Sequence, residues 1–467
     1  GSTSAASPIT VNTGGTLGGN GNAAGPVTLS GGTIAPGTSP GILQTGSVDT
    51  SGGGMVAIEI DGADAGVGAG FHDQLAVTGS VELGAGTAAL MLSGGYVPQA
   101  GDDFVLIAND GAEDTTGFFS GLPEGSELSF NGQTLYITYN GGDGNDVVLN
   151  TGPVVSGTSG SDVLEVTPLA GGDLQYQFLP GGPVVTLTAP ASFTFNGRGG
   201  DDVMIVQANG QSFVPLTFNG GDQDFSNPPT PSNGDALRVF GSGQDAVYTP
   251  SASTTGDGEV SVAGGGTITF TGLEPVDMSG FGTVTFSPAG LDDVLAVDNG
   301  FDSVTGTVPA LVVSGTSGGV AVETLHAWNN TTLAIDTSAS DGGDSVTVNS
   351  ADNAHANQNL SIDTGAAGTD STTFAGAAVV TGTVDVDSGQ ININAAVTAG
   401  LLVDLNAGSD ITTSGAAVDV AAPSLLAVAS GGINLDTSVD GIDATSGDAI
   451  TLDETDAVTL TNVTSNN

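Results

Sequence analysis

Residues 401–460 decide the fold, and they read LLVDLNAGSDITTSGAAVDVAAPSLLAVASGGINLDTSVDGIDATSGDAITLDETDAVTL. Three apolar strands begin at Leu401, Leu425 and Ala449, and each leads through a tight turn into a second short strand. The three units begin about 24 residues apart, and a unit of that length cannot bury its apolar side chains alone. We therefore expect the units to stack on one another.

Side chains alternate in character within these strands. Ile433 and Leu435 are apolar, whereas Asn434 and Asp436 between and after them are polar. Because successive side chains of a strand point to opposite faces, one face lies inward and the other meets water. This pattern predicts a parallel β-helix. An antiparallel sandwich is the alternative, and its hairpins would recur about every 8–12 residues.

The composition of the whole chain also favours strands. Its 467 residues include 77 glycines and 20 prolines, which break helices, and Val, Thr and Ile dominate the apolar runs between them. Hydrophobic residues make up 38% of the chain, which is too many for a disordered acidic tail. We expect an all-β protein with a packed core.

The charge balance excludes several classes of partner. The chain carries 51 acids, two bases and no cysteine, and its formal net charge is −49. Without a series of cationic side chains it cannot neutralise phosphates, so nucleic acid and bare anionic membrane are excluded as direct partners. No run approaches the ~18 apolar residues of a membrane span, so we expect no direct membrane insertion. Because the chain has no cysteine, it cannot form disulfides.

The first third of the chain carries a more specific pattern. It consists, in order, of LSGGTIAPGTSPGIL at 29–43, DQLAVTG at 73–79, GFFSGLP at 117–123 and LYITYNGGDGNDVVL at 135–149. This order resembles the C-terminal end of autotransporter-type passenger β-helices, which also occur in large surface proteins of environmental bacteria. The resemblance implies a secreted, rod-like, right-handed parallel β-helix, and therefore an extracellular or cell-surface bacterial location.

Three segments follow from these patterns. Residues 1–150 are predicted to form a passenger-like β-helix segment, and residues 311–467 a set of parallel β-helix repeats. Residues 151–310 have strand-like pieces separated by unequal loops, including PPTP at 228–231. Proline cannot occupy a central strand, so we expect an irregular, β-sandwich-like domain or insertion there.

Calcium is the predicted ligand. Ten of the 51 acids are glutamate and the rest aspartate, and short carboxylates beside glycine-rich turns supply the oxygen ligands of a hard cation. GGDGNDVVL at 141–149, NGRGGDDVM at 196–204 and, more loosely, GTSGSDVL at 157–164 resemble the calcium-binding nonapeptide repeats of RTX-type β-rolls. The resemblance implies the following metal ligands: Asp143, Asn145, Asp146, Asp162, Asp201 and Asp202. The alternative is that each Asp forms its turn by bonding to nearby backbone.

The sequence does not predict an enzyme. Ser39 and Ser317 match the GxSxG pattern, but neither lies between a strand and a helix, and such matches arise by chance in a chain rich in Gly and Ser. His72, His326 and His355 are scattered. A polysaccharide lyase built on a β-helix remains open, and its cationic base would be Arg198 or Arg238.

We therefore expect an extracellular structural subunit of a bacterial surface fibre, filament or surface layer, assembled end to end by self-association and stabilised by calcium. One alternative is a surface adhesin that binds glycan or another cell through loops at 225–233 and 251–258. Another is the β-helix polysaccharide lyase or hydrolase. Trp328 is either a sugar-stacking platform or an ordinary packed aromatic.

Overall fold

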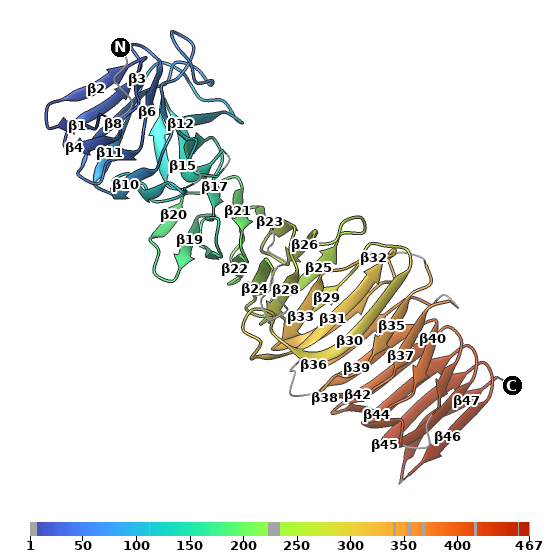
Figure 1. Ribbon diagram of the computed structural model, residues 1–467. Helices are drawn as coiled ribbons and strands as arrows, with labels where there is room; N and C mark the ends of the chain where they lie inside the picture. The colour runs from blue at the N-terminus through green and yellow to red at the C-terminus, as the bar shows by residue number, and fades with distance from the viewer. Residues whose placement is uncertain are drawn as a thin grey trace. The chain divides into compact units, whose positions relative to one another are not determined.

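Figure 1 shows a computed structural model of the chain, which describes residues 7–111, 113–142, 144–222, 234–339, 342–352, 357–366, 369–414, 418–455 and 457–466. Strands account for 59% of it, and the described residues contain no helix. The all-β prediction is therefore confirmed. No helix that is long and apolar enough to cross a membrane occurs in these described ranges.

The chain divides into two compact units. The first comprises Gly1–Asp202 with Val214–Asp222, and the second comprises Val203–Phe213 with Gln223–Asn467. The three segments predicted above were defined by patterns in the sequence, whereas these two units are defined by their compactness. The division into three segments therefore stays a prediction.

In the first unit, the early strands enter three parallel sheets in turn. One sheet holds β1 (Ile9–Asn12), β4 (Val27–Ser30), β7 (Val48–Asp49), β10 (Val81–Ala85) and β13 (Thr116–Phe118). A second holds β2 (Thr16–Gly19), β5 (Thr33–Pro36), β8 (Gly54–Glu59) and β11 (Ala88–Ser93), and a third holds β3 (Asn22–Ala23), β6 (Ile42–Thr45), β9 (Gln74–Val77) and β12 (Asp103–Asn109). After every three strands up to β12, the chain adds one more parallel strand to the same sheet.

Alternating side chains build the core of this unit. In β4, Val27 and Leu29 are buried, whereas Thr28 and Ser30 are exposed. Full burial of a Val or Leu side chain stabilises the fold by about 1.5–3 kcal/mol. The same alternation repeats in β5, where Ile34 is fully buried, so the inward residues of successive strands form one apolar cluster.

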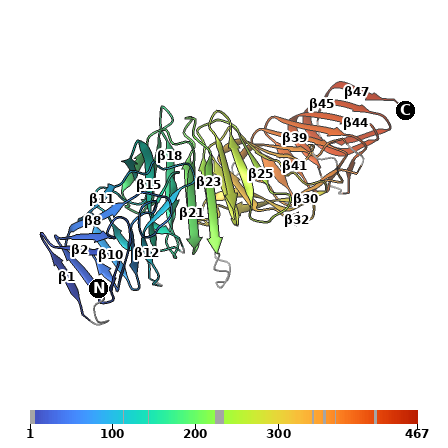
Figure 2. The ribbon, with the colours of Figure 1, turned by 90° about the horizontal axis from the view of Figure 1, so that it is seen from above.

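The third sheet continues into antiparallel strands. β12 pairs with β16 (Asp146–Asn150), β16 with β15 (Gln133–Gly141), and β15 with β14 (Glu127–Phe130). Next come the parallel strands β17 (Val154–Ser156), β21 (Phe193–Gly199) and β23 (Leu216–Asp222), with β21 and β23 side by side in Figure 2. The antiparallel strands β18 (Val163–Pro168), β19 (Leu174–Leu179) and β20 (Val184–Leu187) lie between β17 and β21 in the sequence.

The second unit is built on longer parallel ladders, visible as stacked arrows in Figure 1. One ladder runs β22 (Val203–Gln207), β24 (Ala236–Phe240), β28 (Pro275–Ser279), β33 (Thr324–Trp328). Another runs β25 (Ala246–Pro250), β29 (Thr283–Phe286), β34 (Asn330–Asp336), β36 (Asn357–Asp363), β39 (Thr383–Ser388), β42 (Leu402–Ala407), β44 (Val420–Ala429), β45 (Ile433–Ser446), β47 (Thr459–Ser465). A third runs β30 (Asp293–Phe301), β35 (Ser345–Val348), β37 (Ser371–Phe374), β40 (Gln390–Ile393), β43 (Ile411–Thr413), β45, β46 (Ile450–Glu454).

The stacking predicted for residues 401–460 is parallel, as expected, but its register differs from the prediction. Val403 pairs with Leu425, which confirms the first step. Leu425 then pairs with Ile442, and Ile450 pairs with Ile433. The unit that begins at Ala449 therefore does not follow the one at Leu425 in the same ladder. β45 is one strand of 14 residues, and its second half contains Gly, Asp and Ser residues.

The middle of the chain contains the predicted strands in an arrangement that the sequence did not predict. The strand-like pieces at 193–195, 203–206, 267–270 and 283–286 are all strands. They belong to parallel ladders interrupted by antiparallel additions, namely β26 (Gly258–Val262) with β27 (Thr267–Thr271), and β31 (Pro309–Ser317) beside β30. Because these antiparallel additions differ in length, the parallel strands are unevenly spaced in the sequence although they still pair with one another.

Candidate functional site

The three glycine and aspartate turns all belong to the first unit. Residues 141–146 connect β15 to β16, residues 157–162 connect β17 to β18, and residues 196–202 include the end of β21. Asp143 lies outside the described residues. The other five predicted ligands are Asn145, Asp146, Asp162, Asp201 and Asp202, and all of them are described.

The second and third turns lie on neighbouring parallel strands, although 40 residues separate them. Ser156 pairs with Asn196 at the start of the two turns. Further on, the backbone N–H of Asp162 donates to Oδ1 of Asp202 at 2.7 Å, and the N–H of Asp201 donates to the Ser161 hydroxyl at 3.0 Å. The two turns are therefore stacked, with a buried carboxylate of one turn binding the backbone of the other.

Arg198 connects the first turn to the third. Its Nη1 donates to the carbonyl oxygen of Gly144, and its own backbone has a positive φ of 85°. The three motifs are distant in sequence, yet the chain brings them into one region of the unit. Sequence reasoning missed this connection because nothing in the spacing shows that residue 198 lies beside residue 144.

Most of the predicted ligand side chains bind backbone groups or neighbouring hydroxyls. Asp162 Oδ2 accepts from the N–H of Thr158 at 2.6 Å and from its hydroxyl at 2.9 Å. Asp146 Oδ1 accepts from the N–H of Asn109 at 2.8 Å, and Asn145 Nδ2 donates to the Gly111 carbonyl at 2.7 Å. These are the contacts expected of residues that form turns.

No group of three His, Asp or Glu side chains in the described ranges is placed to hold a metal ion. The stacked turns therefore bring Asp162 and Asp202 together without forming a three-carboxylate cluster there.

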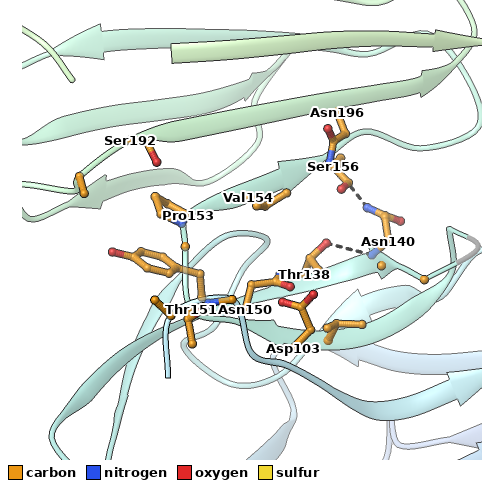
Figure 3. A pocket seen from close by; sticks show the side chains of 18 of the residues that line it. Asp103, Thr138, Asn140, Asn150, Thr151, Pro153, Val154, Ser156, Ser192 and Asn196 are labelled. Carbon is orange, nitrogen blue, oxygen red and sulfur yellow. Dashed lines mark hydrogen bonds between the residues drawn. The ribbon is translucent and has the colours of Figure 1, made fainter. Parts of the chain in front are cut away.

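A cavity of about 840 Å³ lies beside these turns (Figure 3). One wall is a face of the antiparallel strands β12, β16 and β15, and another is formed by β17 and the start of β21. The polar side chains that line it are Asp103, Tyr136, Thr138, Asn140, Asn150, Thr151, Ser156, Ser192, Asn196 and Arg198.

The strand register places three of these side chains in one row. Asp103 of β12 pairs with Asn150 of β16, and Asn150 pairs in turn with Tyr136 of β15. Burial raises the pKa of Asp103, and the neighbouring Asp102 adds to this rise. Burial also raises the pKa of Tyr136, so its hydroxyl keeps its proton at neutral pH.

Glu124 holds the antiparallel strands to β17 beside this cavity. Its Oε2 accepts from the N–H of Tyr139 at 2.7 Å, and its Oε1 accepts from the N–H of Ser156 at 3.1 Å. Burial raises the pKa of Glu124 to about 7, although these hydrogen bonds and Arg198 oppose the rise. No sequence motif marks this residue, since it lies in a loop after Pro123.

Arg238 and Trp328 are packed among other side chains. Arg238 Nε lies 3.0 Å from Asp277 Oδ2, and its Nη2 lies 3.2 Å from Asp302 Oδ2, with both carboxylates fully buried. Trp328 is only 8% exposed and packs edge to face on Phe240 at 6.3 Å, so it is a packed aromatic.

The two GxSxG serines, His72 and His326 do not line the cavity. Ser317 is buried and accepts from the N–H of Gly290, and the exposed Ser39 lies in a turn between β5 and β6. His72 is buried, and Nδ1 of His326 lies 2.6 Å from the Phe301 carbonyl. His355 and the loop at 225–233 lie outside the described residues.

Comparisons of this chain with protein-family models, with curated proteins and with solved structures found no match.

Proposed function

We propose that this chain is the structural subunit of an extracellular bacterial surface fibre or layer. In this proposal it folds as a right-handed parallel β-helix and associates end to end, with calcium as a stabilising ion. The observation that carries the proposal is the parallel ladder of the second unit, in which one strand after another pairs in the same direction from β34 to β47. In such an array each added strand contributes a similar stabilisation, so length costs little.

The edge of this ladder supports self-association. All seven residues of β47 are exposed, and among them Leu460 is 60% and Val463 42% exposed. β47 pairs in parallel with β45. Exposed strands with apolar side chains can pair with a strand of another chain. We propose that a second copy of the chain pairs there.

Stacked carboxylates support the stabilising role of calcium. Asp363 pairs with Asp387, and Asp385 pairs with Asp404 on adjacent parallel strands. Burial raises the pKa of Asp385 and Asp404, and the negative charges of neighbouring aspartates add to both rises. Like charges on neighbouring strands destabilise a sheet, so a divalent cation nearby would relieve repulsion.

Sedimentation velocity over a wide concentration range, in calcium and in chelator, tests the proposal. We expect assemblies that grow with concentration and that are larger in calcium, and negative-stain images of the same samples should show fibres or layers. Val463→Lys should abolish assembly, whereas Leu401→Lys, at a 64% exposed position away from β47, should not. A monomer at every concentration in both buffers would refute self-association.

A further inference from the structure

We propose that the 840 Å³ cavity of the first unit binds a neutral oligosaccharide. This binding function goes beyond the structural role proposed above and does not depend on it. Figure 3 shows Asp103, Thr138 and Asn150 on one side of the cavity, and Ser192, Asn196 and Ser156 on the other.

Several polar side chains that line this cavity have no hydrogen-bond partner in the described part of the chain. Within the part of the chain that the structure describes, the side chains of Asp103, Tyr136, Asn150 and Ser192 form no hydrogen bond. By contrast, Asn196 Oδ1 accepts from Asn219 Nδ2 at 2.7 Å. Free donors and acceptors that converge on one cavity are the usual mark of a ligand site.

The chemistry of this row of side chains suits sugar hydroxyls. The Asp103 carboxylate accepts hydrogen bonds, the Asn150 amide both donates and accepts, and the Tyr136 hydroxyl does the same. A sugar hydroxyl also donates and accepts, so neighbouring hydroxyls of one ring can bind to side chains that lie directly opposite each other on paired strands. The rings of Tyr136 and Pro153 and the side chain of Val154 give apolar surface for the C–H faces of the sugar.

The charge of the site favours a neutral ligand. Arg198 is the only cationic side chain among the lining residues, and it already donates to the Gly144 carbonyl. Asp103 adds a carboxylate to the lining, and the whole chain has a net charge of −49, which repels anions. An acidic polysaccharide would therefore meet repulsion without a matching set of cations.

The size of the cavity agrees with this ligand class. Ligand pockets usually measure about 300–1,000 Å³, and about 840 Å³ leaves room for more than one sugar ring. The walls come from five strands of one compact unit, so the side chains are held on a rigid sheet and lose little freedom on binding.

The test is a titration of the full chain with a panel of oligosaccharides. The neutral members are gluco-, manno-, galacto-, xylo- and N-acetylglucosamine oligomers, and the anionic members are oligogalacturonate and hyaluronan fragments. We expect saturable binding by at least one neutral member and none by the anionic ones. Isothermal titration calorimetry gives the affinity.

Two cavity variants and one control locate the site. Asn150→Ala should weaken binding by at least about tenfold, because it leaves sugar hydroxyls without a partner. Ser192→Trp should abolish binding by filling the cavity, and Asn12→Ala, at an exposed position of β1, should leave it unchanged. An unchanged urea midpoint will show that each variant is folded. Binding only by anionic members, binding that neither cavity variant alters, or no binding by the whole panel would overturn the proposal.

Discussion

Replacement of Arg238 tests the energetic role of the charge network in the second unit. Its guanidinium bridges Asp277 and Asp302, whose side chains are fully buried, while the Arg238 side chain is 12% exposed. The guanidinium carbon also lies 5.4 Å from the centre of the Phe240 ring and 5.8 Å from that of Trp328. The substitution Arg238→Met keeps much of the volume of the side chain and removes its charge.

The two carboxylates differ in what they retain after this change. Asp302 still accepts hydrogen bonds from Thr305, Thr307 and Val308. Asp277 retains the N–H of Ser303 at 3.1 Å and loses its guanidinium. Removal of one partner from a buried ion pair typically costs about 3–5 kcal/mol, so we expect Arg238→Met to lower the free energy of unfolding by about that amount at pH 7.

Trp328 provides the assay, because it is the only tryptophan and lies beside the guanidinium. Urea unfolding followed by its fluorescence gives the free energy of unfolding of wild type and variant. Glu259→Gln, at an exposed position of the same unit, is the matched control for a changed charge and should shift stability by less than about 0.5 kcal/mol. The double variant Arg238→Met/Asp277→Asn should recover part of the loss.

The pH dependence of the stability loss tests whether the unpaired charge of Asp277 causes it. Burial raises the pKa of Asp277 in the folded protein, and His326 and Arg238 oppose that rise. Without Arg238 the pKa should rise further, so the variant loses stability as pH increases through that value and regains it in acid, where Asp277 is protonated. A loss below about 1 kcal/mol at pH 7, or a loss that does not shrink towards pH 4, would refute this account.

Three further predictions concern other parts of the fold. Gly117→Ala should cost at least about 1 kcal/mol in thermal or urea unfolding, because Gly117 has a φ of 82° and an added Cβ would lie 2.1 Å from the Gly84 carbonyl oxygen; an unchanged midpoint would contradict the described backbone. Burial raises the pKa of Asp293 to about 6, so its contribution to the free energy of unfolding should be fully present below about pH 4 and be lost as pH rises through 6, and Asp293→Asn should remove this contribution to the slope in urea titrations at several pH values. Phe195→Ala should cost about 3–5 kcal/mol by circular dichroism, because Phe195 is fully buried and stacks on Phe218 at 5.1 Å, and Phe195→Leu should cost clearly less.

Local patterns made the strands of this protein predictable. The alternation at Ile433 to Asp436 predicted the face that is buried, and the structure confirms it with Ile433 and Leu435 inside. The register was less predictable because it depends on which strands meet. Ile442 pairs with Leu425, although its segment contains Gly441 and several polar residues that are typical of turns.

The candidate site could not be predicted from the alternation of apolar and polar residues, because it depends on how distant strands pair. Asp103, Asn150 and Tyr136 form one row only because β12, β16 and β15 pair antiparallel in one particular register. In the same way, Arg238 stacks on Asp277, and Asp277 on His326, across strands separated by inserted hairpins. The sequence showed each residue, but the pairing of distant strands brings them together.

The placement of the two arginines has a consequence for proteolysis. A trypsin-type protease must bind an arginine in an extended segment that is not paired with another strand. Arg198 is paired through β23, and Arg238 lies in β24 between β22 and β28, so each cleavable bond is already held in a sheet. Digestion then requires the strand to open. At a protease concentration high enough to cleave the open strand before it recloses, the lifetime of this protein measures its unfolding rate.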